Sequence, residues 1–242
     1  MANLLVELGN TALKAAWSEG VTLGKTFRYQ GEKVMDYLLS LLEKEKPGVL
    51  TVATVYHMSS KDEEILRKEC GHLIILDKNH TDTLLRYNLP EYLSYDRAAS
   101  LIAAGFLFKD KPCSVFDFGA TLTIDFLGTD GRYLGGNVSL GCRTRFNALN
   151  RYSKSLPLLD TPENVLPEGN SVESSVESGV ISGIIFEIEG YIERKPQNIV
   201  VFTGGDAIYF AKKMKNSIFV VCNLVLIGLA IITDDYVKKN LK

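Results

Sequence analysis

The order of apolar and polar positions in the first half of the chain predicts three strands followed by alternating helices and strands. Short apolar runs separated by glycine-containing turns indicate the strands, and apolar residues at three- and four-residue steps indicate the helices. Pro47 and Gly48 close the first helix. The predicted strands are 3–8, 12–18, 21–29, 49–56 and 72–77, and the predicted helices are 31–46, 61–70 and 96–108.

The second half predicts the same order of elements, which indicates two similar halves, 1–112 and 113–242. The segment 154–171 is polar and contains three prolines, so we expect a surface loop there. The longest apolar run, 218–232, is shorter than the ~18–20 residues of a membrane span, and we expect a buried strand and the start of a helix. The predicted strands are 114–118, 121–127, 132–139, 198–202 and 217–221, and the predicted helices are 140–153, 172–193, 205–215 and a closing helical region.

One short motif occurs at the corresponding place in each half, in LLVELGNTAL (4–13) and SVFDFGATLT (114–123). An apolar strand ends in a carboxylate, glycine lets the turning backbone approach an anion closely, and threonine offers a hydroxyl and an N–H. Because a carboxylate repels phosphate, a metal ion between the two is implied. The motif predicts a nucleotide clamp, although a plain β-hairpin is the alternative for either copy alone. The repeated residues are Glu7, Gly9 and Thr11, then Asp117, Gly119 and Thr121.

Composition narrows the class of protein. Of the 242 residues, 46% are hydrophobic and 23% are charged, which is typical of a globular chain and excludes a disordered or fibrous one. The net charge of −2 offers no general surface for nucleic acid or anionic lipid, so we expect neither partner. The four cysteines form no CxxC pair and no signal peptide opens the sequence, so we expect free thiols in the cytoplasm. His57, His72 and His80 lack metal-ligand spacing, and we expect structural roles for them.

Two halves of this kind resemble the fold shared by actin, hexokinase, acetate kinase and the heat-shock ATPases. The resemblance implies an α/β protein of two tandem ribonuclease-H-like halves, the actin-like ATPase architecture, with a nucleotide cleft between the halves. Each half of such a protein offers one phosphate-binding hairpin. The fold alone leaves the substrate open.

Five motifs in order are similar to those of type III pantothenate kinases, which phosphorylate pantothenate as the first step of coenzyme A synthesis. ELGNTALK (7–14) resembles Asp-x-Gly-Asn-Thr-x-x-Lys, and YNLPEYLSYDR (87–97) resembles Tyr-x-x-Pro followed by Gly-x-Asp-Arg. DFGATLTID (117–125), GGNVSLG (135–141) and TGGDA (203–207) resemble Asp-x-Gly-Thr-Ala-x-Thr, Gly-Gly-x-Ile-x-Pro-Gly and Thr-Gly-Gly. Any one motif is weak, but five in this order favour the family strongly.

The resemblance implies a site for pantothenate, which carries a carboxylate at one end and a primary hydroxyl at the other. Arg97 has the role of the cation that binds the carboxylate, and Asp96 that of the general base, which orients the hydroxyl and accepts its proton late. A helix cap is the alternative role for Asp96. The other positions that the family places around the substrate are Tyr87, Ser94, Tyr95 and Val172.

The resemblance also implies a site for ATP with Mg²⁺ and for a monovalent cation. Glu7 stands where the family has aspartate in the loop that holds Mg-ATP, so we expect a contact to the metal or its water at a shifted position. Asp117 matches the carboxylate that the family ties to potassium or ammonium. Gly204 and Gly205 begin a predicted helix whose N-terminus favours anions, with a plain turn as the alternative. The other nucleotide-binding positions are Gly9, Asn10, Thr11, Lys14, Gly119 and Thr121.

Four positions depart from the family pattern. Ser94 replaces a glycine, Ala120 replaces a nucleotide-contacting threonine, and Leu140 replaces a proline. Val172 falls where a substrate-binding threonine is expected, with Ser171 beside it. Loss of a hydroxyl at two ligand positions costs about 1–1.5 kcal/mol each, which weakens binding several-fold without abolishing it. Because the predicted base and its neighbouring arginine are retained, we expect an active enzyme.

The resemblance further implies a homodimer with the pantothenate site near the subunit interface, and the apolar segments 96–108 and 172–193 are candidate surfaces. Other functions stay open. A non-catalytic regulatory protein resembling the Bvg accessory factor shares the motifs but does not need the base, and a kinase for another small hydroxy acid has the same ATP hairpins. A ribonuclease-H-like nuclease needs further acids and a basic face, which the sequence does not offer.

Overall fold

The chain forms two units, each with its own sheet. Unit 1 comprises Met1–Leu107 and Asn223–Lys242, and unit 2 comprises Phe108–Cys222. The computed structural model describes residues 2–9, 12–54, 57–77 and 82–241.

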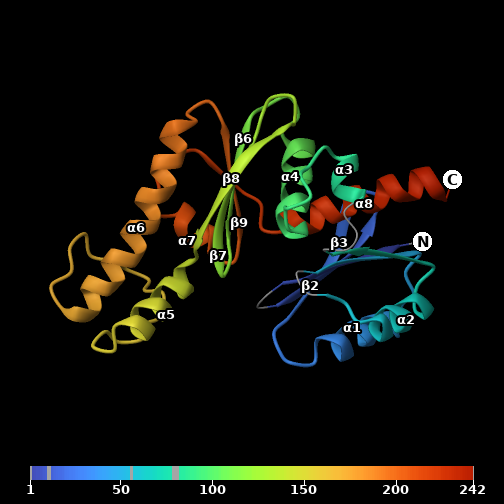
Figure 1. Cartoon of the computed structure of the whole chain (residues 1–242), viewed down its shortest axis with the longest axis horizontal. Helices are drawn as coiled ribbons and strands as arrows, with labels where there is room; N and C mark the ends of the chain where they lie inside the picture. The colour runs from blue at the N-terminus through green and yellow to red at the C-terminus, as the bar shows by residue number, and fades with distance from the viewer. Residues whose placement is uncertain (1, 10–11, 55–56, 78–81, 242) are drawn as a thin grey trace. The chain divides into compact units, whose positions relative to one another are not determined.

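Unit 1 is built on a sheet with helices on both faces (Figure 1). Its strands and helices are β1 (Asn3–Leu8), β2 (Leu13–Glu19), β3 (Thr22–Tyr29), β4 (Val49–Thr54), β5 (His72–Leu76), α1 (Val34–Leu42), α2 (Ser60–Lys68), α3 (Asp82–Arg86), α4 (Tyr95–Leu107) and α8 (Leu224–Asn240). The strand order is β3-β2-β1-β4-β5. Since β1, β4 and β5 run parallel, their carboxyl ends meet at one edge of the sheet.

Alternation along the strands sends side chains to the two faces of the unit 1 sheet. On one face Leu4, Val6 and Val52 belong to a buried apolar cluster with Leu38 of α1 and Leu66 of α2. The opposite face is covered by α4 and α8 (Figure 1). The layers are therefore helix, sheet and helix.

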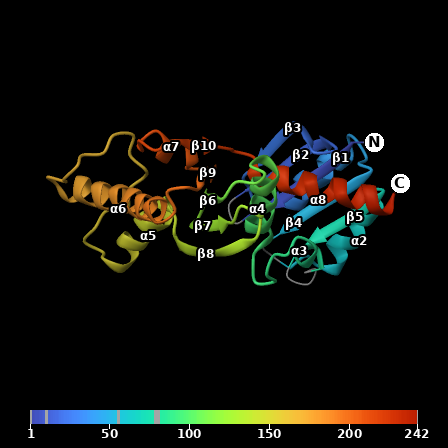
Figure 2. The same cartoon turned by 90° about the horizontal axis from the view of Figure 1, so that it is seen from above.

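Helices α4 and α8 lie side by side and pack at short range (Figures 1 and 2). A Cβ on Gly228 of α8 would lie 2.0 Å from the carbonyl oxygen of Ala99 of α4, so only glycine fits at this contact. Thr233 of α8 donates to the Leu229 carbonyl (2.7 Å) and shares a 2.6 Å hydrogen bond with Thr51 of β4. These contacts fix α8 against the sheet and fix α4, which carries the predicted base, against α8.

Unit 2 repeats the topology of unit 1. Its strands and helices are β6 (Cys113–Phe118), β7 (Thr121–Leu127), β8 (Tyr133–Leu140), β9 (Ile199–Gly204), β10 (Ile218–Val220), α5 (Cys142–Tyr152), α6 (Val172–Arg194) and α7 (Ala207–Ala211). The order is β10-β9-β6-β7-β8, with β6 antiparallel to β7 and parallel to β9, as β1 is to β2 and β4. This equivalence confirms the predicted α/β fold of two ribonuclease-H-like halves.

One face of the unit 2 sheet packs against α5, α6 and α7. Phe202 of β9 contacts the rings of Phe116 and Phe118 of β6, with centroids 5.3 and 4.8 Å apart. Phe118 also stacks on Phe210 of α7 at 5.1 Å. This aromatic cluster holds the ends of β6 and β9 together, where candidate nucleotide-binding residues lie.

The structure differs from the predicted elements in three places. The five-residue helix α3 falls in a segment where no element is predicted. The helix expected over 205–215 is only α7, because the Lys213 N–H donates to the Phe210 carbonyl and closes it with a tight turn. The sequence prediction assigns the C-terminal segment to the second half, 113–242. In the structure this segment forms α8, which packs on α4 and β1 and belongs to unit 1. In the part of the chain that the structure describes, no helix is long and apolar enough to cross a membrane.

Candidate active site

The β1–β2 hairpin places the first acidic motif at the edge where the parallel strands of unit 1 end. Glu7 is paired in register with Lys14 of β2. The Lys14 ammonium lies 3.3 and 3.2 Å from the two oxygens of the Glu7 carboxylate. At the turn the Gly9 N–H donates to the Ala12 carbonyl (3.1 Å). Asn10 and Thr11, which the sequence predicts as phosphate ligands, lie outside the described residues.

Burial governs the ionisation of Glu7. The side chain is 12% exposed, and burial raises its pKa, which the Lys14 ammonium only partly offsets. The charge of Asp96 raises the pKa of Glu7 further, so the predicted base lies close enough for the two carboxylates to interact. The hairpin acid, its lysine and the predicted base therefore gather at one edge of the unit 1 sheet.

We expect Glu7→Gln to raise the free energy of unfolding at neutral pH. The pKa of Glu7 in the folded protein lies above the unfolded value of 4.5, so the stability associated with its proton is fully present below pH 4.5. That stability is lost as the pH rises through the pKa of Glu7 in the folded protein. Glutamine does not ionise, so the variant does not lose this stability. Chemical denaturation of wild type and Glu7→Gln, from below pH 4.5 to pH 7, measures the difference in their free energies of unfolding. A variant less stable than wild type at pH 7 would show that the Lys14 ion pair outweighs burial.

The second candidate set stands at the first turn of α4. The helix begins at Tyr95, which is buried, and the Ala98 N–H donates to the Ser94 carbonyl (2.9 Å). Asp96 lies inside this turn, half-buried, and its Oδ1 accepts the Arg97 N–H at 2.9 Å. Asp96 is therefore the second residue of the helix and not its N-cap, so the alternative role of a cap for a helix that starts at residue 97 does not hold. Within the described residues the Asp96 Oδ2 has no hydrogen-bond partner, so one oxygen remains to accept a hydrogen bond from a ligand.

The Tyr87 side chain is hydrogen-bonded to the C-terminal helix, α8. Its hydroxyl donates to Oδ2 of Asp235 in α8 at 2.6 Å. Burial first, and then this hydrogen bond to a carboxylate, raise the pKa of Tyr87 well above its usual value. The structure therefore gathers in unit 1 the predicted positions Glu7, Lys14, Tyr87, Ser94, Tyr95, Asp96 and Arg97.

In unit 2 the β6–β7 hairpin lies beside the turn that follows β9. Asp117 is paired in register with Thr123 of β7 and Thr203 of β9. The Gly119 N–H donates to the Thr121 carbonyl (3.0 Å) across the turn. Two residues connect β6 to β7, against four between β1 and β2, so the two phosphate hairpins share a motif but not a loop length.

Close packing requires glycine at the Thr-Gly-Gly motif. Gly204 has a φ of 91°, and a Cβ there would lie 2.5 Å from Oδ1 of Asp117 and from the Phe118 nitrogen. The Gly205 N–H donates to the Phe118 carbonyl (2.8 Å). The motif is thus a turn packed against the second hairpin. The helix that follows is a single short turn, α7, so the expected dipole contribution is small.

The start of α5 braces the second hairpin, a feature that the sequence analysis does not predict. The Thr144 hydroxyl donates to the Ala120 carbonyl (2.6 Å), as does the Gly141 N–H (3.0 Å). A Cβ on Gly141 would lie 2.0 Å from the Gly119 carbonyl oxygen. Gly141 is the last residue of the GGNVSLG motif, so the motif marks it as a candidate site residue. Nothing in the sequence singles out Thr144.

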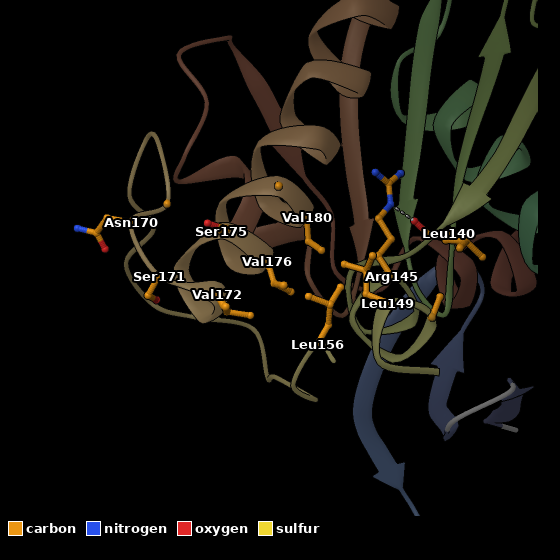
Figure 3. Close-up of a pocket in the computed structure, with 13 residues that line it drawn as sticks. Leu140, Arg145, Leu149, Leu156, Asn170, Ser171, Val172, Ser175, Val176 and Val180 are labelled. Carbon is orange, nitrogen blue, oxygen red and sulfur yellow. Dashed lines mark hydrogen bonds between the residues drawn. The ribbon is translucent and has the colours of Figure 1, made fainter. Parts of the chain in front are cut away.

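A cavity of about 910 Å³ lies between α5, α6 and the loop before α6 (Figure 3). Val172, the predicted substrate-binding position in unit 2, lines this cavity and is 52% exposed. Figure 3 shows Val176 and Val180 of α6 pointing into the same hollow. The Arg145 side chain in the lining donates to the Leu140 carbonyl (2.8 Å) and forms an ion pair with a glutamate of α6. The cavity wall is therefore largely apolar and its cation is already paired.

The described residues offer no ready-made metal centre. Among them, no group of three or more His, Cys, Asp or Glu side chains is placed to hold a metal ion. A magnesium ion that arrives with ATP needs only one or two protein carboxylates, because phosphate and water supply the other ligands. Glu7 and Asp117 are the acids whose strand-end positions fit such a role.

Two units with this strand order, each with a glycine turn after an acidic strand, define a protein of the actin-like fold. Solved structures agree with this class. The activator of 2-hydroxyisocaproyl-CoA dehydratase from Clostridium difficile with bound ADPNP has a TM-score of 0.62 at 14% identity, over 100% of this chain and 97% of that one. The ROK hexokinase from Thermus thermophilus has a TM-score of 0.54 at 12% identity, over 96% and 98%. These likenesses show the fold alone.

The model of the type III pantothenate kinase family matches residues 3–194, and the chain belongs to this family. The type III pantothenate kinase of Azobacteroides pseudotrichonymphae genomovar. CFP2 is 34% identical over 230 residues, 93% of this chain and 94% of the relative. That of Bacteroides fragilis (strain YCH46) is 33% identical over 232 residues, 94% and 95%. A Campylobacter jejuni structure described as a Baf family transcriptional activator has a TM-score of 0.64 at 20% identity, over 98% of both chains, which again shows the fold alone.

Proposed function

We propose that this protein transfers the γ-phosphate of ATP to the primary hydroxyl of pantothenate, giving 4'-phosphopantothenate, the first step of coenzyme A synthesis, in the cytoplasm. The observation that carries the proposal is the Asp96–Arg97 pair at the first turn of α4, beside Glu7 of the first hairpin. Membership of the type III pantothenate kinase family supports both substrates.

Asp96 and Arg97 act on opposite ends of pantothenate in this proposal. The Arg97 guanidinium binds the carboxylate, for which its fork of N–H donors is suited. The Asp96 Oδ2 accepts a hydrogen bond from the substrate hydroxyl. This contact orients the hydroxyl oxygen toward the γ-phosphorus of ATP. The proton passes to Asp96 late, because the transition state of phosphoryl transfer is loose. The Arg97 N–H on Oδ1 fixes the orientation of this carboxylate.

Magnesium fits the first hairpin through water. Both Glu7 oxygens are already engaged by Lys14, so a water-mediated contact to the metal is favoured over direct ligation. When bound, Mg²⁺ neutralises charge on the phosphates. Lys14 adds a second positive charge beside the turn, and Gly9 lets the backbone approach the anion.

The second hairpin supplies the remaining nucleotide contacts in this proposal. Potassium or ammonium beside Asp117 would reduce the repulsion between this acid and the phosphates. Gly119 and Thr121 provide the hairpin turn, and the Gly204–Gly205 turn packed against Asp117 provides a surface without side chains for the nucleoside.

We further infer that the protein is a homodimer. Val138 and Leu140 lie two positions apart on one side of the edge strand β8 and are 57% and 46% exposed, and Leu134 near the start of this strand is 48% exposed. Leu140 also lines the cavity that Val172 lines, so the C-terminal end of β8 adjoins this cavity. An exposed apolar edge strand is a surface that proteins bury against a partner. Light scattering at micromolar concentration should give the mass of two chains for wild type and of one chain for Val138→Asp; a wild-type monomer contradicts the inference.

ADP release with pantothenate as the only acceptor tests the proposed function. We expect turnover in potassium buffer and much weaker turnover in sodium buffer. Equal turnover in both buffers would support the kinase activity and contradict the role of the monovalent cation. Protein that binds ATP but shows no turnover with pantothenate in either buffer would contradict the proposal and favour a regulatory protein or a kinase for another hydroxy acid.

A further inference from the structure

The segment between α3 and α4 carries several positions that the proposed function places around pantothenate, and its backbone is set by a few anchors. Asn88 has a φ of 54°, the left-handed conformation that ends a helix, and the Leu89 N–H donates back to the Leu84 carbonyl (3.0 Å). Leu89 and Leu93 are 4% and 3% exposed, so both leucines pin the segment to the core. These anchors fix the backbone but leave open the direction of the Tyr87 side chain.

A single polar contact described for Tyr87 fixes that direction. Its hydroxyl donates to Oδ2 of Asp235 at 2.6 Å, across 148 positions of sequence. The hydrogen bond is charge-assisted, which makes it stronger than one between neutral groups. A phenol donates one proton, so a hydroxyl committed to Asp235 is not available to donate to a substrate carboxylate.

Asp235 stands on a rigid support. Two residues earlier in α8, Thr233 bonds to Thr51 of β4, an interior strand of the sheet, and Gly228 of the same helix packs on α4. Its neighbour Asp234 pairs with Lys238 instead, at 2.6 Å. Helix α8 therefore presents two adjacent acids with different partners, and one of them reaches the segment that leads into the Asp96–Arg97 turn.

We propose that Asp235 is a positioning residue for pantothenate binding, which holds the Tyr87 hydroxyl so that the aromatic ring presents a fixed surface to the substrate. This inference rests on the proposed function and adds a residue beyond position 194, where the family match ends. Tyr87 then contributes ring contact to the apolar part of pantothenate, while Arg97 binds the carboxylate. Loss of the Tyr87–Asp235 hydrogen bond frees the ring to rotate and weakens substrate binding without touching the chemical step.

Steady-state kinetics of Asp235→Asn, Tyr87→Phe and the double variant test the inference. Each single variant should raise the KM for pantothenate about fivefold or more, while kcat and the KM for ATP stay within about twofold. The double variant should be no worse than the poorer single variant, because both changes break the same hydrogen bond. Asp234→Asn is the matched control, since it makes the same change one residue away and leaves Tyr87 bonded; its KM should equal that of wild type.

The outcomes separate this inference from the proposed function. No pantothenate turnover by wild type overturns the proposed function and this inference with it. Normal wild-type turnover with an unchanged KM in Asp235→Asn overturns the inference alone, even where thermal unfolding shows lost stability. Effects of Tyr87→Phe and Asp235→Asn that multiply in the double variant also overturn it, because two residues that act through one contact cannot contribute independently.

Discussion

Asp96→Asn is expected to lower kcat for pantothenate phosphorylation at least about 100-fold, the lower end of what a positioned general base contributes. Asparagine keeps the size of the side chain and can still accept the Arg97 N–H through its carbonyl oxygen, so the first turn of α4 should survive. The change replaces the oxygen that has no partner in the described structure with an amide that cannot take a proton. The loss should therefore appear in kcat rather than in the KM for ATP.

Single-turnover measurement of phosphopantothenate formation, together with ATP binding by calorimetry, checks this expectation. Asp36→Asn is the matched control, because Asp36 also stands in the first turn of a unit 1 helix but is exposed and is not one of the predicted site residues. That variant should keep wild-type kcat. If Asp96→Asn retains more than about a tenth of wild-type kcat, Asp96 only orders the first turn of α4 and the base lies elsewhere.

Gly228→Ala is expected to destabilise the protein by about 2–3 kcal/mol and to lower its thermal midpoint by several degrees. The new methyl carbon would lie 2.0 Å from the Ala99 carbonyl oxygen, and backbone cannot rotate away as a flexible side chain can. Either α8 or α4 must shift, and α4 carries Asp96. Pantothenate turnover should therefore fall together with stability.

Differential scanning calorimetry of Gly228→Ala beside Gly190→Ala isolates the steric cause. Gly190 is an exposed helical glycine of α6 where an added Cβ meets nothing within 4 Å, so alanine there should stabilise the helix by about 0.5–1 kcal/mol. Opposite signs at the two positions are the expected result. A Gly228→Ala variant as stable as wild type would mean that α4 and α8 tolerate a wider separation than the close contact at Ala99 implies.

The two hairpins show how far local pattern reaches. The acid and glycine spacing of LLVELGNTAL and SVFDFGATLT predicts both turns correctly, because a strand that ends before glycine is a local property. Loop length differs, with four connecting residues after β1 and two after β6. Thr144 and Gly141, which brace only the second turn at the Ala120 carbonyl, come from a helix more than twenty positions away. The GGNVSLG motif marks Gly141 but not its partner, and no local pattern points to Thr144.

The sequence by itself determined the order of strands and helices apart from the short helix α3, the duplicated acidic motif and the five motifs of the pantothenate kinase family, because periodicity and spacing act over a few neighbouring residues. Only the tertiary structure decided that α8 belongs to unit 1, that Gly228 sets its distance from α4, and that Asp235 bonds Tyr87. These features depend on shape complementarity between segments far apart in the chain. Packing selects such partners after the local elements have formed, and no local pattern specifies them.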